Sequence, residues 1–329
     1  MGDEKNWMDS LSEPLVKLIE CVSGGIGKVY EPMHIKRVAK AKAAEIATVS
    51  EAMANNMALP IVYDDGKILI STQDYNDLAI RAKNRLCFQE VKKQQNIEAV
   101  ISNAYTELET VDSVSNIPVD EDWINSFFDS VAYVSSEQMQ RLWGKLLAGE
   151  VESPGSFSLR TLNVLKRLST KEANIFKNVS PYVLNCSGDN ERTYSDYFLM
   201  PNEDNNLLSK YNISFADIML LSEAGLMYQN SQIFISVMIN KNKSELIRGL
   251  SRSISISTSE DTNVRLIHHA HLLTEAGKEL LPTVLNNEMI ESANAYLLDC
   301  LDEIKTNGNI QPIGSRENLC FKVMENSLR

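Results

Sequence analysis

The stretch SSEQMQRLWGKLLAGEVESPGSFSLRTLNVLKRLS, residues 135–169, carries the clearest fold signals in this chain of 329 residues. Its apolar residues recur every three or four positions, which predicts amphipathic helices. Gly149 predicts the end of one helix, and Pro154 with Gly155 predicts the turn that follows. Ser158 predicts the start of the next helix. The middle of the chain is therefore expected to be a compact bundle of short helices.

Capping signals mark where these helices begin. Ser135 is followed three residues later by Gln138, and Ser169 by Glu172, which is the spacing of a capping box. Asp120 can cap a helix that carries three aromatic residues. We therefore expect helices to start at these three positions.

Upstream of the bundle the sequence predicts longer elements. Residues 34–57 are rich in Ala, Lys and Glu and predict a long helix. Residues 61–70 predict two short strands around an Asp-Gly turn, and residues 72–108 predict a second long helix. Two long helices around a hairpin predict an elongated antiparallel pair, an arrangement that favours self-assembly. We take residues 1–112 as this first region.

Residues 7–29 predict an amphipathic helix followed by a flexible Gly24-Gly25-Ile26-Gly27 segment. The favoured interpretation is a helix that docks on the body of the protein or on a second copy. Peripheral membrane contact by the same residues is the alternative, which Glu13 and Glu20 weaken.

The sequence after the helical bundle changes to β-branched runs. A helix is predicted over residues 207–226, and strands over 233–239, 248–256 and 264–273. The phrase LTEAGKELL, residues 273–281, is similar to the end of a winged-helix unit, where a wing strand runs into a helix, here one that Thr274 can cap. The expected fold class is thus a mainly α N-terminal half followed by an α+β, winged-helix-like C-terminal domain. The bundle is assigned to residues 113–190 and this last domain to residues 191–329.

Charge and cysteine usage limit the environment and the partners. The formal net charge is −12, so the mean field repels nucleic acid and anionic membranes. Five single cysteines without a Cys-x-x-Cys pair argue against a disulfide framework or a zinc knuckle. A cytoplasmic protein with a protein partner, forming a homo-oligomer, is the expectation.

The sequence lacks the common catalytic and cofactor motifs. No G-x-S-x-G, H-E-x-x-H or G-x-G-x-x-G after a strand is present, and no cofactor is expected. His269 and His271 would share one face of a strand, which makes them weak candidates for a metal site that lacks further ligands. The absence of motifs leaves enzyme activity open, although the balance favours a protein that is not an enzyme.

Nucleic-acid contact has one sequence argument for it and one against. The helix that would read DNA, residues 214–225, contains no Arg or Lys. Lys241, Lys243, Arg248 and Arg252 lie near the expected wing and could contact phosphates or a partner. Nucleic acid is therefore an alternative that the net charge does not favour.

The central block resembles a family of uncharacterised bacterial proteins classified as a domain of unknown function. The resemblance rests on residues 135–162, with the pattern S-x-E-x-M-Q-x-x-W-x-K-x-L-A-G-E-x-x-x-P-G-S-x-S-x-R-T-L, on VDEDWINSFFDSV at 119–131 and on KKQQNIEAVISNA at 92–104. The segments at 24–45 and 273–281 extend it over most of the chain. The resemblance implies a bacterial cytosolic protein, with relatives that look like accessory genes of mobile elements and phage defence.

The polar residues of this block have two interpretations. Most of the block is explained by helix packing and turns, whereas a shared polar site would consist of Lys145, Glu150 and Arg160. The leading hypothesis is a non-enzymatic interaction and assembly protein, a component of phage defence, that recognises another macromolecule. The alternatives are a DNA-binding regulator that uses the winged-helix-like domain and an effector enzyme, a nuclease, with an unrecognised site.

Overall fold

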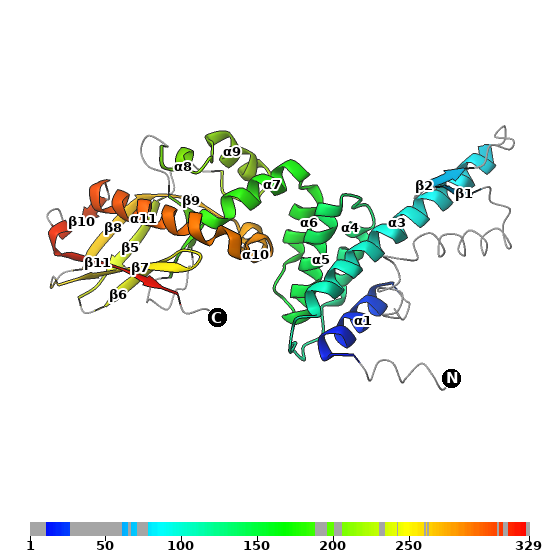
Figure 1. The fold of residues 1–329 in the computed structure, drawn as a ribbon, viewed down its shortest axis with the longest axis horizontal. Helices are drawn as coiled ribbons and strands as arrows, with labels where there is room; N and C mark the ends of the chain where they lie inside the picture. The colour runs from blue at the N-terminus through cyan, green and yellow to red at the C-terminus, as the bar shows by residue number, and fades with distance from the viewer. Residues whose placement is uncertain are drawn as a thin grey trace. The chain divides into compact units, whose positions relative to one another are not determined.

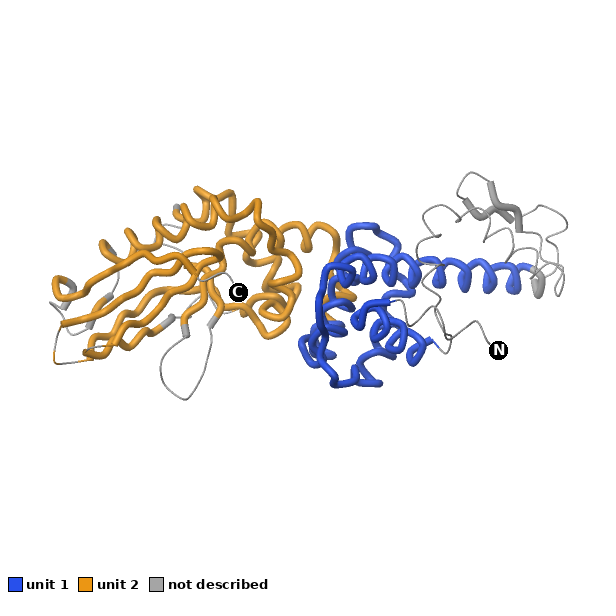
Figure 2. The backbone as a smooth tube through the Cα atoms, turned by 60° about the horizontal axis from the view of Figure 1, so that its bottom comes forward, with its two compact units in different colours: residues 1–162 blue, residues 163–329 orange. Residues whose placement is uncertain are grey.

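The structure is a computed structural model that describes residues 11–26, 61–64, 67–70, 78–187, 196–200, 206–229, 234–241, 243–259, 261, 263–307, 309–311 and 315–326. The chain forms two compact units, residues 1–162 and 163–329 (Figure 2). The expected order of fold classes is confirmed, because helices make the first half and helices with antiparallel sheets make the second (Figure 1). The finer division at residues 112 and 190 stays a prediction.

The first unit is built from helices around one long central helix. Its elements are α1 (Glu13–Ile26), β1 (Ile61–Asp64), β2 (Lys67–Ile70), α3 (Leu78–Leu108), α4 (Glu121–Val131), α5 (Glu137–Glu152) and the first turn of α6 (Leu159–Arg167). Helix α3 packs along α5, and α1 packs against α3, α4 and α5. The expected hairpin is confirmed, with β1 antiparallel to β2. The helix expected over 34–57 lies outside the described residues.

Aromatic side chains fill the core of this unit. Trp143 and Phe127 are fully buried, and their ring centroids lie 5.4 Å apart in an edge-to-face contact. Trp123 stacks on Phe127 at 5.1 Å. As expected, Asp120 caps α4 by accepting a hydrogen bond from the Trp123 amide at 2.9 Å. The sequence thus predicts both the start of α4 and the aromatic side chains that pack it into the core.

Helix α1 buries the apolar face that the sequence predicted. Leu15, Leu18, Ile19 and Val22 are buried in the first unit, so this face is used inside the protein. The expectation of a flexible Gly24-Gly25 segment is wrong, because the helix continues through both glycines. A Cβ at Gly25 would lie 2.5 Å from the Phe128 ring, so this glycine allows close packing of α1 on α4. None of the described helices is long and apolar enough to cross a bilayer.

Two expectations for the central block need correction. Helix α5 does not end at Gly149 but continues to Glu152, since the Ser153 amide still donates a helical hydrogen bond to the Gly149 carbonyl at 2.9 Å. The expected capping box at Ser135 is also wrong: the N-cap is Ser136, and its side chain makes no capping hydrogen bond. The box of Ser169 and Glu172 is confirmed and begins α7 (Thr170–Val179).

The second unit combines two antiparallel sheets with helices. After α7 and η2 (Ser180–Tyr182), the strands are β3 (Leu184–Ser187), β4 (Asp196–Leu199), β5 (Phe234–Ile239), β6 (Ser244–Arg248), β7 (Arg252–Thr258), β8 (Val264–His269), β9 (His271–Leu272), β10 (Asn309–Gln311) and β11 (Leu319–Glu325). The helices among them are α8 (Asn206–Lys210), α9 (Phe215–Glu223), α10 (Glu275–Val284), η3 (Asn287–Met289), α11 (Ile290–Asn307) and η4 (Ser315–Asn318). One sheet has the order β11-β7-β6-β3-β4-β9 and the other β10-β8-β5.

Helix α11 contributes much of this unit's core. It packs on β7 and on η2, and its buried residues include Leu297, Cys300 and Ile304. Tyr296 is fully buried on the same helix, and its hydroxyl donates to the Met200 carbonyl at 3.0 Å and accepts from the Met200 amide at 2.9 Å. These two bonds fix the segment after β4 to α11.

Three elements expected as continuous are interrupted. The helix expected over 207–226 is two helices, since Asn212 adopts a left-handed conformation (φ 58°) and Ser214 caps a new helix. The strand expected over 248–256 bends after Arg248, and β6 and β7 pair as a hairpin. The strand expected over 264–273 divides at Ala270, and its two parts join different sheets.

Candidate interaction surface

Helix α9 begins with its own capping box. The Ser214 amide donates to Asp217 Oδ2 at 2.8 Å, and the Asp217 amide donates back to Ser214 Oγ at 3.2 Å. This reciprocal pair satisfies amides that the first turn of a helix leaves without partners. Ile218 and Leu221 then point into the core of the second unit.

The opposite face of α9 leaves large apolar side chains exposed. Phe215 is 55% exposed and Met219, one turn later, is 42% exposed. Ala216 lies exposed between them along the helix, and Leu220 is half-buried. The helix is therefore apolar on both sides, although only one side has a core to cover it. Contiguous apolar patches on a protein surface mark interaction sites, and this face is therefore the candidate surface of the second unit.

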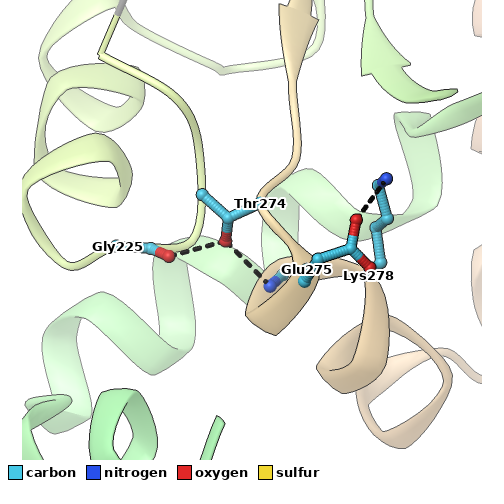
Figure 3. A network of polar contacts seen from close by, with 5 residues as sticks. Gly225, Thr274, Glu275 and Lys278 are labelled. Carbon is cyan, nitrogen blue, oxygen red and sulfur yellow. Dashed lines mark hydrogen bonds and ion pairs between the residues drawn. The ribbon is translucent and has the colours of Figure 1, made fainter. Parts of the chain in front are cut away.

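A junction of backbone and side-chain contacts holds the C-terminal end of α9 (Figure 3). Gly225 ends the helix with a positive φ of 81°, which a glycine adopts without strain. The Thr274 hydroxyl donates to the Gly225 carbonyl at 2.6 Å and accepts from the Gly277 amide at 3.2 Å. One threonine thus closes α9 and caps α10 together.

Gly277 allows the two chain segments to approach this closely. A Cβ at Gly277 would lie 2.2 Å from the Leu226 carbonyl oxygen, a distance that no side chain tolerates. Residues 226–228 and 271–273 run side by side, with Met227 bridging Leu273 and the Tyr228 amide donating to the Leu272 carbonyl at 3.0 Å. The LTEAGKELL phrase is therefore a packing motif that fixes the position of α9.

The surface of α9 has no positive charge of its own. Residues 214–225 contain Asp217 and Glu223 but neither Arg nor Lys. Tyr228 follows and is exposed as well. Such a face suits apolar contact with another protein better than contact with phosphates.

The four predicted basic contact residues lie in two separate places. Lys241 and Lys243 lie just before β6, whereas Arg248 ends this strand and Arg252 starts β7. A strand of this length separates the two pairs by about 17 Å. Lys241 forms an ion pair with Asp261, and Arg252 lies 3.7 Å from Glu325, so one cation of each pair has an acidic neighbour.

The two candidate histidines lie at the junction of β8 and β9. His269 ends β8 and is exposed, and His271 begins β9 and is half-buried. Burial, together with the nearby His269, lowers the pKa of His271. Among the described residues, no group of three or more His, Cys, Asp or Glu side chains could hold a metal ion.

Glu150 has a structural task in the central block. It is 1% exposed, and its carboxylate accepts hydrogen bonds from the Gly155 amide at 2.7 Å and the Phe157 amide at 3.0 Å. It therefore closes the turn between α5 and α6 from inside. Lys145 is half-buried on α5, while Arg160 is exposed in the first turn of α6. A shared polar site of these three residues stays a prediction.

A cavity of about 420 Å³ in the first unit lies between α1 and residues 114–121. Cys21 lines this cavity. Burial, and to a lesser extent the charge of Glu150, raises the pKa of the Cys21 thiol to about 12. A thiol of this kind stays protonated at neutral pH and is a weak nucleophile.

Sequence reasoning named residues 214–225 as a recognition helix but did not predict which face of this helix is exposed, because burial depends on the elements that pack against it. The capping-box spacing of Ser214 and Asp217 is the signal that would have placed the start of α9.

Comparison with known proteins gives one match. A family model described as a protein of unknown function (DUF2806) matches residues 80–295, more than half of the chain. No curated protein and no solved structure matches.

Proposed function

The chain belongs to the DUF2806 family of proteins of unknown function, and we propose that it is a non-enzymatic interaction protein that docks a protein partner on α9. The observation that carries the proposal is the exposure of Phe215 and Met219 on a helix whose ends are both capped. A rigid helix loses little conformational freedom on binding, so its apolar contacts contribute more fully to affinity.

We propose further that this part of the second unit is winged-helix-like. Its support is the chain order α7, η2, β3, β4, α8, α9 and residues 226–228, followed after β5 to β8 by β9 and α10. Strand β9 pairs with β4, and the 226–228 segment runs beside residues 272–273. In this interpretation α9 corresponds to the recognition helix, and residues 229–270, with β5 to β8, replace the wing tip.

The charge of α9 decides between a protein and a nucleic-acid partner in this proposal. A recognition helix for DNA contacts phosphates and base edges with Arg, Lys, Asn or Gln. Helix α9 offers Phe215 and Met219 there, with Asp217 and Glu223 as its only charges. These side chains favour a protein surface.

The direct test compares partner capture by the full chain and by the double variant Phe215→Ser/Met219→Ser. We expect cross-linked protein partners from a bacterial host to be lost with the variant and kept with Leu298→Ser, which removes a similarly exposed apolar side chain (41%) from α11. Equal capture by all three proteins would contradict the role of α9.

Self-association and DNA binding are separated by light scattering in ~150 mM salt, with and without duplex DNA. We propose a homo-oligomer that is indifferent to DNA. A mass increase with DNA that is lost at high salt, and weakened by changing Lys241, Lys243, Arg248 and Arg252, would favour the DNA-binding regulator instead.

The proposed biological setting is phage defence in the bacterial cytoplasm, with the pattern over residues 135–162 as the mark of the family. Its test is the plating efficiency of phages on cells with and without the gene. Metal-dependent loss of plasmid or RNA integrity in the presence of pure protein would instead favour a nuclease.

A further inference from the structure

A polar cavity of about 350 Å³ in the second unit lies where three elements meet. The end of α7 with η2 forms one side, the turn between α8 and α9 forms another, and η3 with the start of α11 forms the third. Its size is at the lower end of the about 300–1,000 Å³ that ligand pockets occupy. A molecule of the size of a nucleoside fits this volume.

The aromatic part of the cavity wall is fixed by the core. Tyr182 and Tyr211 line the cavity, with ring centroids 5.0 Å apart, and each ring also contacts the buried Tyr296, at 5.3 Å and 5.2 Å. The Tyr211 hydroxyl donates to Asp299 Oδ2 at 2.5 Å, and Lys210 Nζ lies 2.6 Å from the same oxygen. Both ring positions are therefore set before any ligand arrives, which lowers the cost of binding.

Three carboxamides line the same cavity. Asn178 comes from α7, Asn212 from the turn before α9, and Asn286 from the start of η3. Each carboxamide offers two donors and an acceptor. All three asparagines are exposed, and Asn286 makes no capping hydrogen bond with η3. These groups are available to a ligand that both donates and accepts.

The charges at the cavity are balanced. Of the described residues that line it, Lys177 and Glu288 are the only ionisable ones apart from the two tyrosines. One positive and one negative side chain favour a ligand that is neutral or carries one small charged group. An apolar ligand would leave the three carboxamides without partners, which costs free energy.

We propose that this cavity binds a purine nucleoside of the adenosine type, free or as its monophosphate. The flat base would lie against the tyrosine wall, because aromatic rings stack on the π-face of any base. An asparagine carboxamide matches the donor and acceptor edge of adenine in a bidentate pair. Glu288 can accept from the ribose hydroxyls, as acidic residues do in dinucleotide-binding folds. Lys177 is the cation that a monophosphate would use.

This inference does not depend on the proposed partner of α9, although the two sites are neighbours in sequence. Asn212 lies two residues before Ser214, the N-cap of α9. A ligand held by Asn212 would therefore contact the turn from which α9 starts.

The test is titration calorimetry of the full chain with adenosine and with its monophosphate, up to about 1 mM. We expect saturable binding at one site. Two exposed positions can be changed with little effect on the fold: Asn178→Ala in α7, and Asn212→Gly, because glycine accepts the positive φ. Each variant should bind about tenfold more weakly. The matched control is Asn174→Ala, an exposed asparagine of the same helix that does not line the cavity, which should bind like the unchanged protein.

The other outcomes distinguish the free nucleoside from its monophosphate as the ligand. Tighter binding of the monophosphate, lost with Lys177→Ala, would support the nucleotide form, and equal binding would support the free nucleoside. Absence of saturable binding, unchanged affinity in both asparagine variants, or equal binding of ribose or inorganic phosphate alone would overturn the proposal.

Discussion

The central block at 135–169 and helix α9 use their side chains in opposite ways. In the central block Glu150, one of the three candidate site residues, points inward and holds the turn after α5. Helix α9 has no polar motif on its outer face, yet it leaves Phe215 and Met219 exposed. A dense sequence pattern can therefore reflect packing, whereas the exposed apolar face of α9 has no sequence motif that marks it.

The largest effect in the first unit is expected from Glu150→Ala in the central block. The change leaves the Gly155 and Phe157 amides without their acceptor and should lower the free energy of unfolding of the first unit by about 3 kcal/mol. Tryptophan fluorescence during denaturation measures this unit, because all three tryptophans lie in residues 1–162. The control is Glu152→Ala, an exposed residue on the same helix, which should change stability by less than about 0.5 kcal/mol. Similar losses in both variants would refute the structural role of Glu150.

A second prediction concerns Gly144, also in the central block. A Cβ there would lie 2.5 Å from Asn103 Cβ and 3.0 Å from the Ala104 nitrogen, so Gly144→Ala should force α5 away from α3. We expect a loss of about 2 kcal/mol in the free energy of unfolding, in spite of the better helix propensity of alanine. Gly24→Ala, where no atom lies within 4 Å, should instead stabilise the same unit by up to about 1 kcal/mol. If both changes stabilise the unit, the close approach of α5 and α3 is not required.

The third prediction concerns the strand that pairs beside the end of α9. Burial lowers the pKa of His271 in the folded protein below the ordinary value of 6.5, so the unfolded chain binds the proton more readily. Burial of neutral His271 therefore contributes stability that is fully present above about pH 6.5. This stability is lost as the pH falls through the pKa of His271 in the folded protein. Hydrogen exchange of the β9 peptide should become faster over that range, and His271→Asn should reduce this pH dependence. An unchanged dependence in the variant would show that another group titrates.

The smallest effect on stability is expected on α9 itself. Phe215→Ser/Met219→Ser removes two side chains that lie on the exposed face of α9. The free energy of unfolding of the second unit should therefore change by about 0.5 kcal/mol or less. The matching inward change, Leu221→Ala, should cost about 2–5 kcal/mol because that side chain is fully buried. A large loss in the serine double variant would mean that this face belongs to the core of the second unit.

The sequence by itself determined the local elements whose signals lie within a few residues. The Asp120 cap, the Ser169–Glu172 box, the 61–70 hairpin and the Thr274 cap all formed where expected, because each needs only neighbouring backbone and one side chain. The order of a helical half and an α+β half followed from the same signals.

Only the tertiary structure decided which faces were covered and which polar groups met. Contacts between distant segments decide three features that the sequence did not predict. They bury the Glu150 side chain, leave Phe215 exposed, and bring Asn178, Asn212 and Asn286 to one cavity. Periodicity gives the apolar face of a helix but not the element that covers it, since burial is a property of the packed chain.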